Sequence, residues 1–221
     1  MLPSVRRQRL FRCFFYGTGV LSLALGLTMS TQAGLGVGPV VTVPYTLSLH
    51  TGITLGTATF TVYLLYVLLQ LLLDRGREAL RTALQIPFSV VFGGLLDLLG
   101  AWVRFPVTAL WQRALLYAAS LFFSAGGVAL SLPMRLVNNP ADGFARALGE
   151  RTGRGTGTGK NLLDLCCVGL ALLVQLVTGR SVGAIGVGTL VSAVATGRLL
   201  ALFNRLFRRR METLAGLHPE P

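Results

Sequence analysis

Four charged side chains lie inside long apolar stretches of this sequence, and they are the first candidates for chemistry. They are Asp97, Lys160, Asp164 and Arg198. A charge facing lipid costs about 2.5 to 3.5 kcal/mol or more, so a charge in an apolar span usually faces a partner or a polar cavity. These four residues are therefore predicted to take part in ion or proton coupling.

Each of these charges also has a structural explanation. Lys160 and Asp164 are four residues apart, which places both on one helix face as an ion pair, or leaves Lys160 to reach the membrane surface. Arg198 is an alternative partner for Asp164. Three roles stay open for Asp97: pairing with Lys160 or Arg104, capping a glycine-rich contact, or carrying a proton.

A glycine-rich segment over residues 34–39 precedes a short apolar run, residues 40–49, that ends at a second turn. Pro39 suits the first position of a helix, where its missing amide proton is no loss. Free amides at such a helix N-terminus attract an anion or a carboxylate. We therefore predict substrate binding by Gly34, Gly36, Gly38 and Pro39. The alternative is a glycine-rich turn that lets two helices approach closely.

A second broken segment, residues 138–143, has asparagine and aspartate in place of most of the glycines. Asn139 as N-cap, Pro140 at the first helical position and Asp142 in the first turn would together satisfy a helix N-terminus. The functional alternative is a site near the membrane centre. There, Asn138, Asn139 and Asp142 would face the segment 34–39 and bind substrate with it.

Composition places these residues in a membrane protein. Of 221 residues, 52% are apolar and 13% are charged, whereas soluble chains carry about 25% charged residues. A helix that crosses a bilayer needs about 20 apolar residues. The expected spans are residues 12–32, 54–73, 82–101, 113–133, 161–178 and 182–204.

An internal repeat relates the two halves of the chain at an offset of 101 positions. Helix breakers coincide: Gly26 with Gly127, Pro39 with Pro140, and the pair 51–52 with the Thr-Gly pair 152–153. Because leucines alone would match by chance, coinciding glycines and prolines indicate a shared backbone. After a small change in spacing, Gly94 also meets Gly197.

The short segments are too short to cross a bilayer, so each half is expected to cross three times, and the second half is inverted relative to the first. This arrangement places 17 of the 20 basic residues on the cytoplasmic side. The predicted fold is an all-α polytopic membrane protein with about six transmembrane helices and two short re-entrant or interfacial half-helices, arranged as two inverted repeats. Its parts are a basic cytoplasmic N-terminus (1–11), repeat 1 (12–104), repeat 2 (113–206) and a cytoplasmic tail (207–221), expected to be disordered from residue 211.

Other classes of function find little support in the sequence. The formal net charge of +12 gathers at helix ends, as the positive-inside rule predicts, so anionic lipid headgroups and not nucleic acid are the expected partners. The two histidines, His50 and His218, form no catalytic or metal-binding pattern, and the three cysteines have no metal spacing. We expect no enzyme activity, no cofactor and no metal. A homo-oligomer stays open.

Three segments carry a resemblance to a known family. Residues 33–39, residues 139–143 and the glycine-rich residues 182–189 resemble the YczE/YyaS/YitT-like family of small bacterial integral membrane proteins, over roughly residues 12–206. The resemblance implies a bacterial inner-membrane location and a transporter-like fold, without a substrate. The chain departs from the family pattern at Val137-Asn138-Asn139, where family members tend to repeat Gly-x-Gly-Pro.

Inverted repeats with broken helices are typical of transporters that work by alternating access. The predicted function is transport of a small molecule, with a slight preference for anionic or zwitterionic solutes. The alternative is a membrane scaffold or regulator that contacts a partner protein through small residues such as Gly93, Gly94, Gly183, Gly186 and Gly188.

Overall fold

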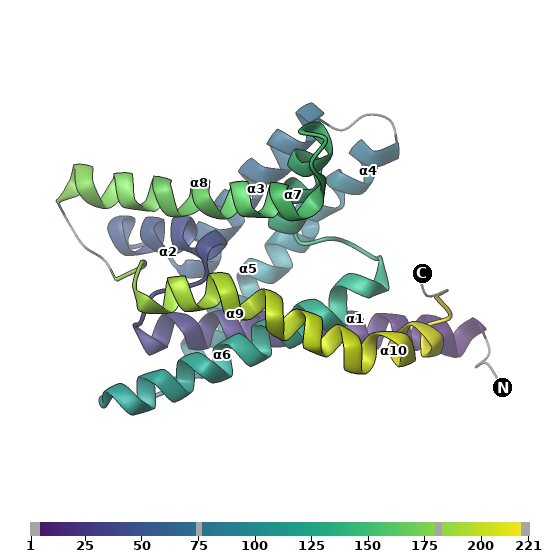
Figure 1. Ribbon diagram of the computed structural model, residues 1–221, viewed down its shortest axis with the longest axis horizontal. Helices are drawn as coiled ribbons and strands as arrows, with labels where there is room; N and C mark the ends of the chain where they lie inside the picture. Colours follow the sequence, from purple (N-terminus) through teal and green to yellow (C-terminus); the bar gives the residue numbers. More distant parts are fainter. Residues whose placement is uncertain (1–4, 74–76, 180–182, 218–221) are drawn as a thin grey trace.

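The structure is a computed structural model that describes residues 5–73, 77–179 and 183–217. Over these residues the chain is helical, without β-strands. Six helices are long and apolar enough to cross a membrane, which confirms the predicted spans. They are α1 (Val5–Ala33), α3 (Leu55–Leu73), α6 (Leu110–Ser131) and α8 (Gly155–Thr178), together with two spans in which α5 (Gln85–Trp102) and α9 (Val187–Phe203) continue into the short helices beside them (Figure 1).

Two shorter helices follow the broken segments, as predicted. They are α2 (Pro39–Thr51) and α7 (Pro140–Arg151), and each begins at its proline. Proline fixes a helical φ and lacks the amide proton that a first turn leaves unpaired, so it starts a helix at low cost. The two start points are 101 residues apart.

Some elements were not expected from the sequence. A short helix, α4 (Arg77–Ala83), precedes α5, and a π-helical turn, Asn204–Arg208, joins α9 to α10 (Arg209–Leu214). The prediction of disorder from residue 211 is wrong for residues 211–217, because Met211 and Ala215 are buried against Met134. Residues 218–221 lie outside the described part.

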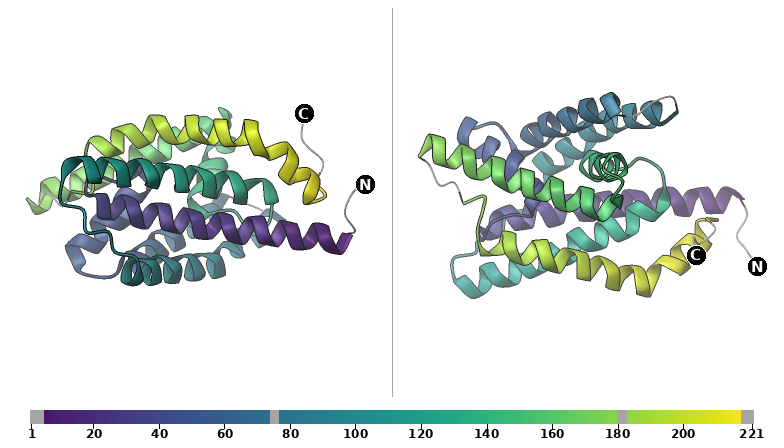
Figure 2. Two further views of the ribbon diagram at one scale, coloured as in Figure 1. Left: turned by 90° about the horizontal axis from the view of Figure 1, so that it is seen from below. Right: turned by 45° about the horizontal axis from the view of Figure 1, so that its top comes forward.

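Helices α1 and α6 lie antiparallel and pack along most of their length (Figure 2). Helix α5 packs on α1 and α9 on α6, while α2, α3, α7 and α8 form the other side of the molecule. Helix α1 begins and helix α10 ends at the same end of the bundle, which we call the proximal end. The end at which α1 stops is the distal end.

The close contacts between α1 and α6 occur in pairs whose members are related by the internal repeat. A Cβ atom on Gly26 would lie 2.6 Å from the amide nitrogen of Ser124, and one on Gly127 would lie 2.5 Å from the amide nitrogen of Leu23. Gly127 is 101 positions after Gly26, and Ser124 is 101 positions after Leu23, so each contact is the counterpart of the other. Glycine at both positions therefore permits one symmetrical close approach.

Two hydrogen bonds join residues that are themselves 101 positions apart. The Ser22 hydroxyl donates to the Phe123 carbonyl at 2.9 Å. The Tyr66 hydroxyl and the Cys167 thiol share a hydrogen bond of 3.1 Å. A residue that touches its own counterpart lies close to the axis that relates the halves.

The two halves differ in how their last two long helices pack against each other. In the first half α3 packs closely on α5, where Gly93 lies against Gly56. The corresponding helices of the second half, α8 and α9, make no extensive contact over their described residues and diverge in Figure 1. This difference is the largest departure from symmetry between the halves.

Candidate functional site

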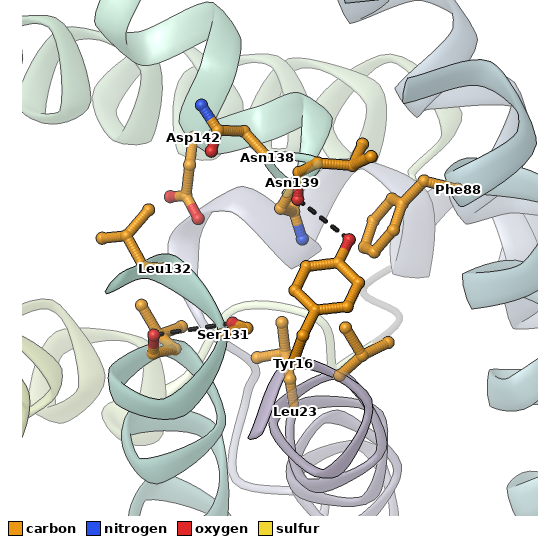
Figure 3. A pocket seen from close by; sticks show the side chains of 11 residues that line it. Tyr16, Leu23, Phe88, Ser131, Leu132, Asn138, Asn139 and Asp142 are labelled. Carbon is orange, nitrogen blue, oxygen red and sulfur yellow. Dashed lines mark hydrogen bonds between the residues drawn. The ribbon is translucent and has the colours of Figure 1, made fainter. Parts of the chain in front are cut away.

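A small pocket with a largely apolar lining and a few polar side chains lies between α1, α5, α6 and the start of α7, toward the proximal end (Figure 3). The Asp142 carboxylate points into it, and Tyr16 and Ser131 line the opposite side. In this conformation the pocket has room for about one water molecule. The complete lining is Tyr16, Val20, Leu23, Phe88, Val128, Ser131, Leu132, Val137, Asn138, Asn139 and Asp142.

The start of α7 forms the polar wall of this pocket. The Asn139 side chain accepts a hydrogen bond of 2.9 Å from the Ala141 amide, which confirms its predicted N-cap role. Asp142 lies in the first turn, where a carboxylate complements the helix dipole. Its Oδ1 lies 3.9 Å from Lys160 Nζ on α8. The wall thus presents the Asp142 carboxylate and the Asn138 and Asn139 side chains, and Lys160 lies beside it as the partner of Asp142.

Residues of α1 hold the segment that leads into α7. Arg12 donates hydrogen bonds from Nε to the Met134 carbonyl at 2.6 Å and from Nη2 to the Arg135 carbonyl at 3.1 Å. The Tyr16 hydroxyl donates to the Val137 carbonyl at 2.9 Å. Because these carbonyls have no helix partner, Arg12 and Tyr16 fix the proximal side of the pocket.

Buried polar side chains from α3 and α5 anchor α7 from the other side. The amides of Gln70 and Gln85 form two reciprocal hydrogen bonds of 3.1 and 3.2 Å, and Gln70 also donates to the Pro140 carbonyl at 3.1 Å. Asn139 donates to the Tyr63 hydroxyl at 3.1 Å. The position of α7 therefore depends on a polar cluster inside the bundle.

Sequence reasoning missed Tyr16, Tyr63, Gln70 and Gln85 as parts of this region. It searched for charges and helix breakers, and these side chains are uncharged. A usable signal was present, since glutamines within apolar spans often form hydrogen bonds between helices.

The other predicted binding segment, residues 34–39, packs against the segment that opens α9. The Val37 amide donates to the Ala184 carbonyl at 3.0 Å, and the Gly188 amide donates to the Leu35 carbonyl at 2.8 Å. Gly36 has a φ of +98°, and a Cβ atom there would lie 2.6 Å from the amide nitrogen of Gly186. The glycines allow a close backbone contact, and Val37 is fully buried.

None of the residues of the first broken segment lines this pocket. The second segment contacts α1 at Tyr16, whereas the first begins where α1 ends, at Ala33. At 1.5 Å per residue, these two points on α1 are about 25 Å apart. From Ala33 the chain leads to Pro39, and Val40 packs on the same core cluster as Ala141 of α7. A shared site near the membrane centre, formed by Gly34, Gly36, Gly38 and Pro39 with Asn138, Asn139 and Asp142, stays a prediction.

The charged residues predicted for coupling lie in different places. Lys160 pairs with Asp142, and no contact to Asp164 within ion-pair distance is present. The Oδ1 atom of Asp164 is buried without a hydrogen-bond partner. Arg198 is exposed on α9, and no described residue forms an ion pair with it.

Of the three roles left open for Asp97, the structure shows the cap. Its carboxylate accepts hydrogen bonds of 2.7 Å from both the Thr54 hydroxyl and the Gly56 amide, at the start of α3. Gly56 in turn lies against Gly93 of α5. Asp97 therefore stabilises the N-terminus of α3 and joins it to α5.

No group of three His, Cys, Asp or Glu side chains lies close enough to hold a metal ion within the described ranges.

Six apolar helical spans are long enough to cross a membrane, and many of their large hydrophobic side chains are exposed. These features define a polytopic helical membrane protein that contacts the bilayer. A family model described as a family of unknown function (DUF6198) matches residues 10–205, and the chain belongs to that family. It is 24% identical over 200 residues to the uncharacterized protein YyaS of Bacillus subtilis (strain 168), covering 88% of this chain and 93% of YyaS. It is 22% identical over 197 residues to the uncharacterized membrane protein YczE of the same organism, covering 89% and 86%. These relatives agree with the family resemblance of the sequence. No solved structure matches the chain.

Proposed function

We propose that this protein transports a small zwitterionic or anionic solute across the bacterial inner membrane by alternating access, and is not an enzyme. Both termini are cytoplasmic in this proposal, because the proximal end carries the basic start of α1 and the basic residues of α10. The pocket at the start of α7 is its binding site.

The exchange of contacts between the halves supports an inverted repeat. Helices α1 and α6 occupy equivalent places, run antiparallel and cross with Gly26 and Gly127 in matching contacts. Two equivalent units that cross in opposite directions have opposite orientations in a membrane. Helices α2 and α7 are then half-helices that enter from opposite sides, which is the arrangement found in many secondary transporters.

The observation that carries the proposal is the difference between the two ends of the molecule. At the distal end, residues 34–39 are closed against residues 184–188 by backbone hydrogen bonds. At the proximal end, the equivalent segment borders the pocket into which the Asp142 carboxylate points. Alternating access requires equivalent elements in unequal states, one closed and the other accessible to a solute. The narrow pocket represents a contracted form that must widen when solute enters.

The chemistry of the pocket wall favours a zwitterion. The Lys160 ammonium group, 3.9 Å from the Asp142 carboxylate, suits an acidic group of the solute. The Asp142 carboxylate suits an amino group. Separate groups of both signs, a few ångströms apart, match a small molecule that carries both charges.

The test is a thermal-shift screen of the purified protein against matched panels of small zwitterions, anions and cations. We expect zwitterions to raise the melting temperature of the wild type, and the shift to disappear in Asp142→Asn. Glu150→Gln is the matched control, because Glu150 lies on the same helix and pairs with Arg146 away from the pocket. Uptake of the identified zwitterion into proteoliposomes must show the same pattern. A shift that survives Asp142→Asn, or binding without uptake, would overturn the proposal.

A further inference from the structure

Helix α9 exposes the face that its counterpart α5 buries. In α5, Ser89 and Phe92 are fully buried, and Phe92 stacks on Tyr63 of α3. At the offset of 101 that relates α1 to α6, these two residues correspond to Leu190 and Ala193 of α9, which are both exposed. The exposed fraction of Leu190 is 74%. Arg198, which corresponds to Asp97, lies on the same exposed face.

Helix α8 carries the matching surface. Gly157 corresponds to Gly56, the residue that lies against α5, but a Cβ atom on Gly157 would meet nothing within 4 Å. On α9, Val194 stands where α5 has Gly93, the residue that lies against Gly56. The space beside Gly157 is therefore unused in this conformation, and the Val194 side chain sets a wider spacing for an approach of α9 to α8 than the spacing between α3 and α5.

We propose that a second conformation closes α9 onto α8, as α5 is closed onto α3, and brings Arg198 to Asp164. This inference rests on the proposed alternating access, in which the two halves exchange their conformations. The α3 and α5 pair then separates, and the Asp97 cap on Gly56 is lost. In this second conformation, α8 of the same chain covers the exposed face of α9.

Charge gives the closure a driving force. Arg198 is exposed on a helix within the bilayer, which is costly. In the arrangement of α3 and α5, Arg198 would lie near Gly157, and side chains on a helix lean toward its start. For α9 that direction leads along α8 toward Asp164, whose Oδ1 has no partner in the present conformation. Closure would pair the Arg198 guanidinium group with the Asp164 carboxylate.

Two pairs of spin labels test this inference by double electron–electron resonance. One pair replaces the exposed residues Leu65 and Val91 on α3 and α5, and the other replaces Leu165 and Val191 on α8 and α9. Both are placed in a variant that lacks Cys13, Cys166 and Cys167, reconstituted in lipid without solute. We expect two distances for each pair, with the shorter α8–α9 distance accompanied by the longer α3–α5 distance.

Charge variants identify the cause of the shift. Arg198→Ala and Asp164→Asn should each reduce the ratio of closed to open α8–α9 populations about tenfold, while Arg198→Lys preserves most of it. The double reversal Arg198→Asp with Asp164→Arg should restore it. One unchanging α8–α9 distance in every variant would overturn the inference, as would a short distance that disappears on dilution with unlabelled protein, which would assign it to two copies. Because no solute is present, this outcome is independent of the thermal-shift screen.

Discussion

Replacing Gly127 by alanine is expected to destabilise the protein by about 1 to 3 kcal/mol, the usual cost of overpacking a tight contact. The added Cβ atom would lie 2.5 Å from the amide nitrogen of Leu23 and 2.6 Å from the Gly19 carbonyl oxygen. Both are backbone atoms of α1, so neither can move without shifting the helix. The expected fall in melting temperature in detergent is roughly 5 °C.

The neighbouring residue supplies the control for this prediction. A Cβ atom on Gly126 would meet only the Phe203 ring, at 3.5 Å, which is an ordinary contact. Gly126→Ala should leave the melting temperature unchanged or raise it, because alanine favours a helix by about 0.5 to 1 kcal/mol over glycine. Equal effects of the two substitutions would contradict the close crossing of α1 and α6.

Replacing Gln85 by alanine is expected to cost about 1 to 2 kcal/mol, because it leaves the buried Gln70 amide with fewer partners. Gln70→Ala should cost more, since it also removes the hydrogen bond to the Pro140 carbonyl at the start of α7. Chemical or thermal unfolding in detergent measures both losses. Any solute that binds the pocket should also bind the Gln70→Ala variant more weakly.

A double variant separates the pair from general packing. Gln70→Ala combined with Gln85→Ala should cost less than the sum of the two single losses, because the second substitution removes a group already left without its partner. Gln175→Ala is the control, since the Gln175 side-chain nitrogen is buried without a partner. Additive losses, or an equal loss in the control, would show that the reciprocal hydrogen bonds contribute little.

Much of the fold was predictable from local sequence. The spans are apolar runs of the required length, so their positions agree with α1, α3, α5, α6, α8 and α9. The short helices α2 and α7 were predictable because Pro39 and Pro140 set their first residues. Local preferences of this kind act within a few residues and do not depend on tertiary packing.

The arrangement of the site was less predictable, because it depends on which helix ends meet. Loop composition alone favoured a site shared by the two broken segments, whereas the pocket is lined by the second segment together with residues of α1, α5 and α6. The i, i+4 spacing favoured Lys160 with Asp164, but the tertiary neighbour Asp142 takes Lys160 instead. The order of residues 211–217 depends on Met211 packing against Met134, a contact between distant parts of the chain.

The most direct test of the central claim, two halves inserted in opposite orientations, is labelling of Thr51→Cys and Thr152→Cys with a membrane-impermeant maleimide. Both residues are exposed, follow the two short helices and are 101 positions apart. In a bacterial host and a variant without the native cysteines, cysteine at position 51 should react in cells whose inner membrane is intact. Cysteine at position 152 should react only after that membrane is permeabilised. Reaction of both positions from the same side would contradict the inverted repeat and the transport mechanism built on it.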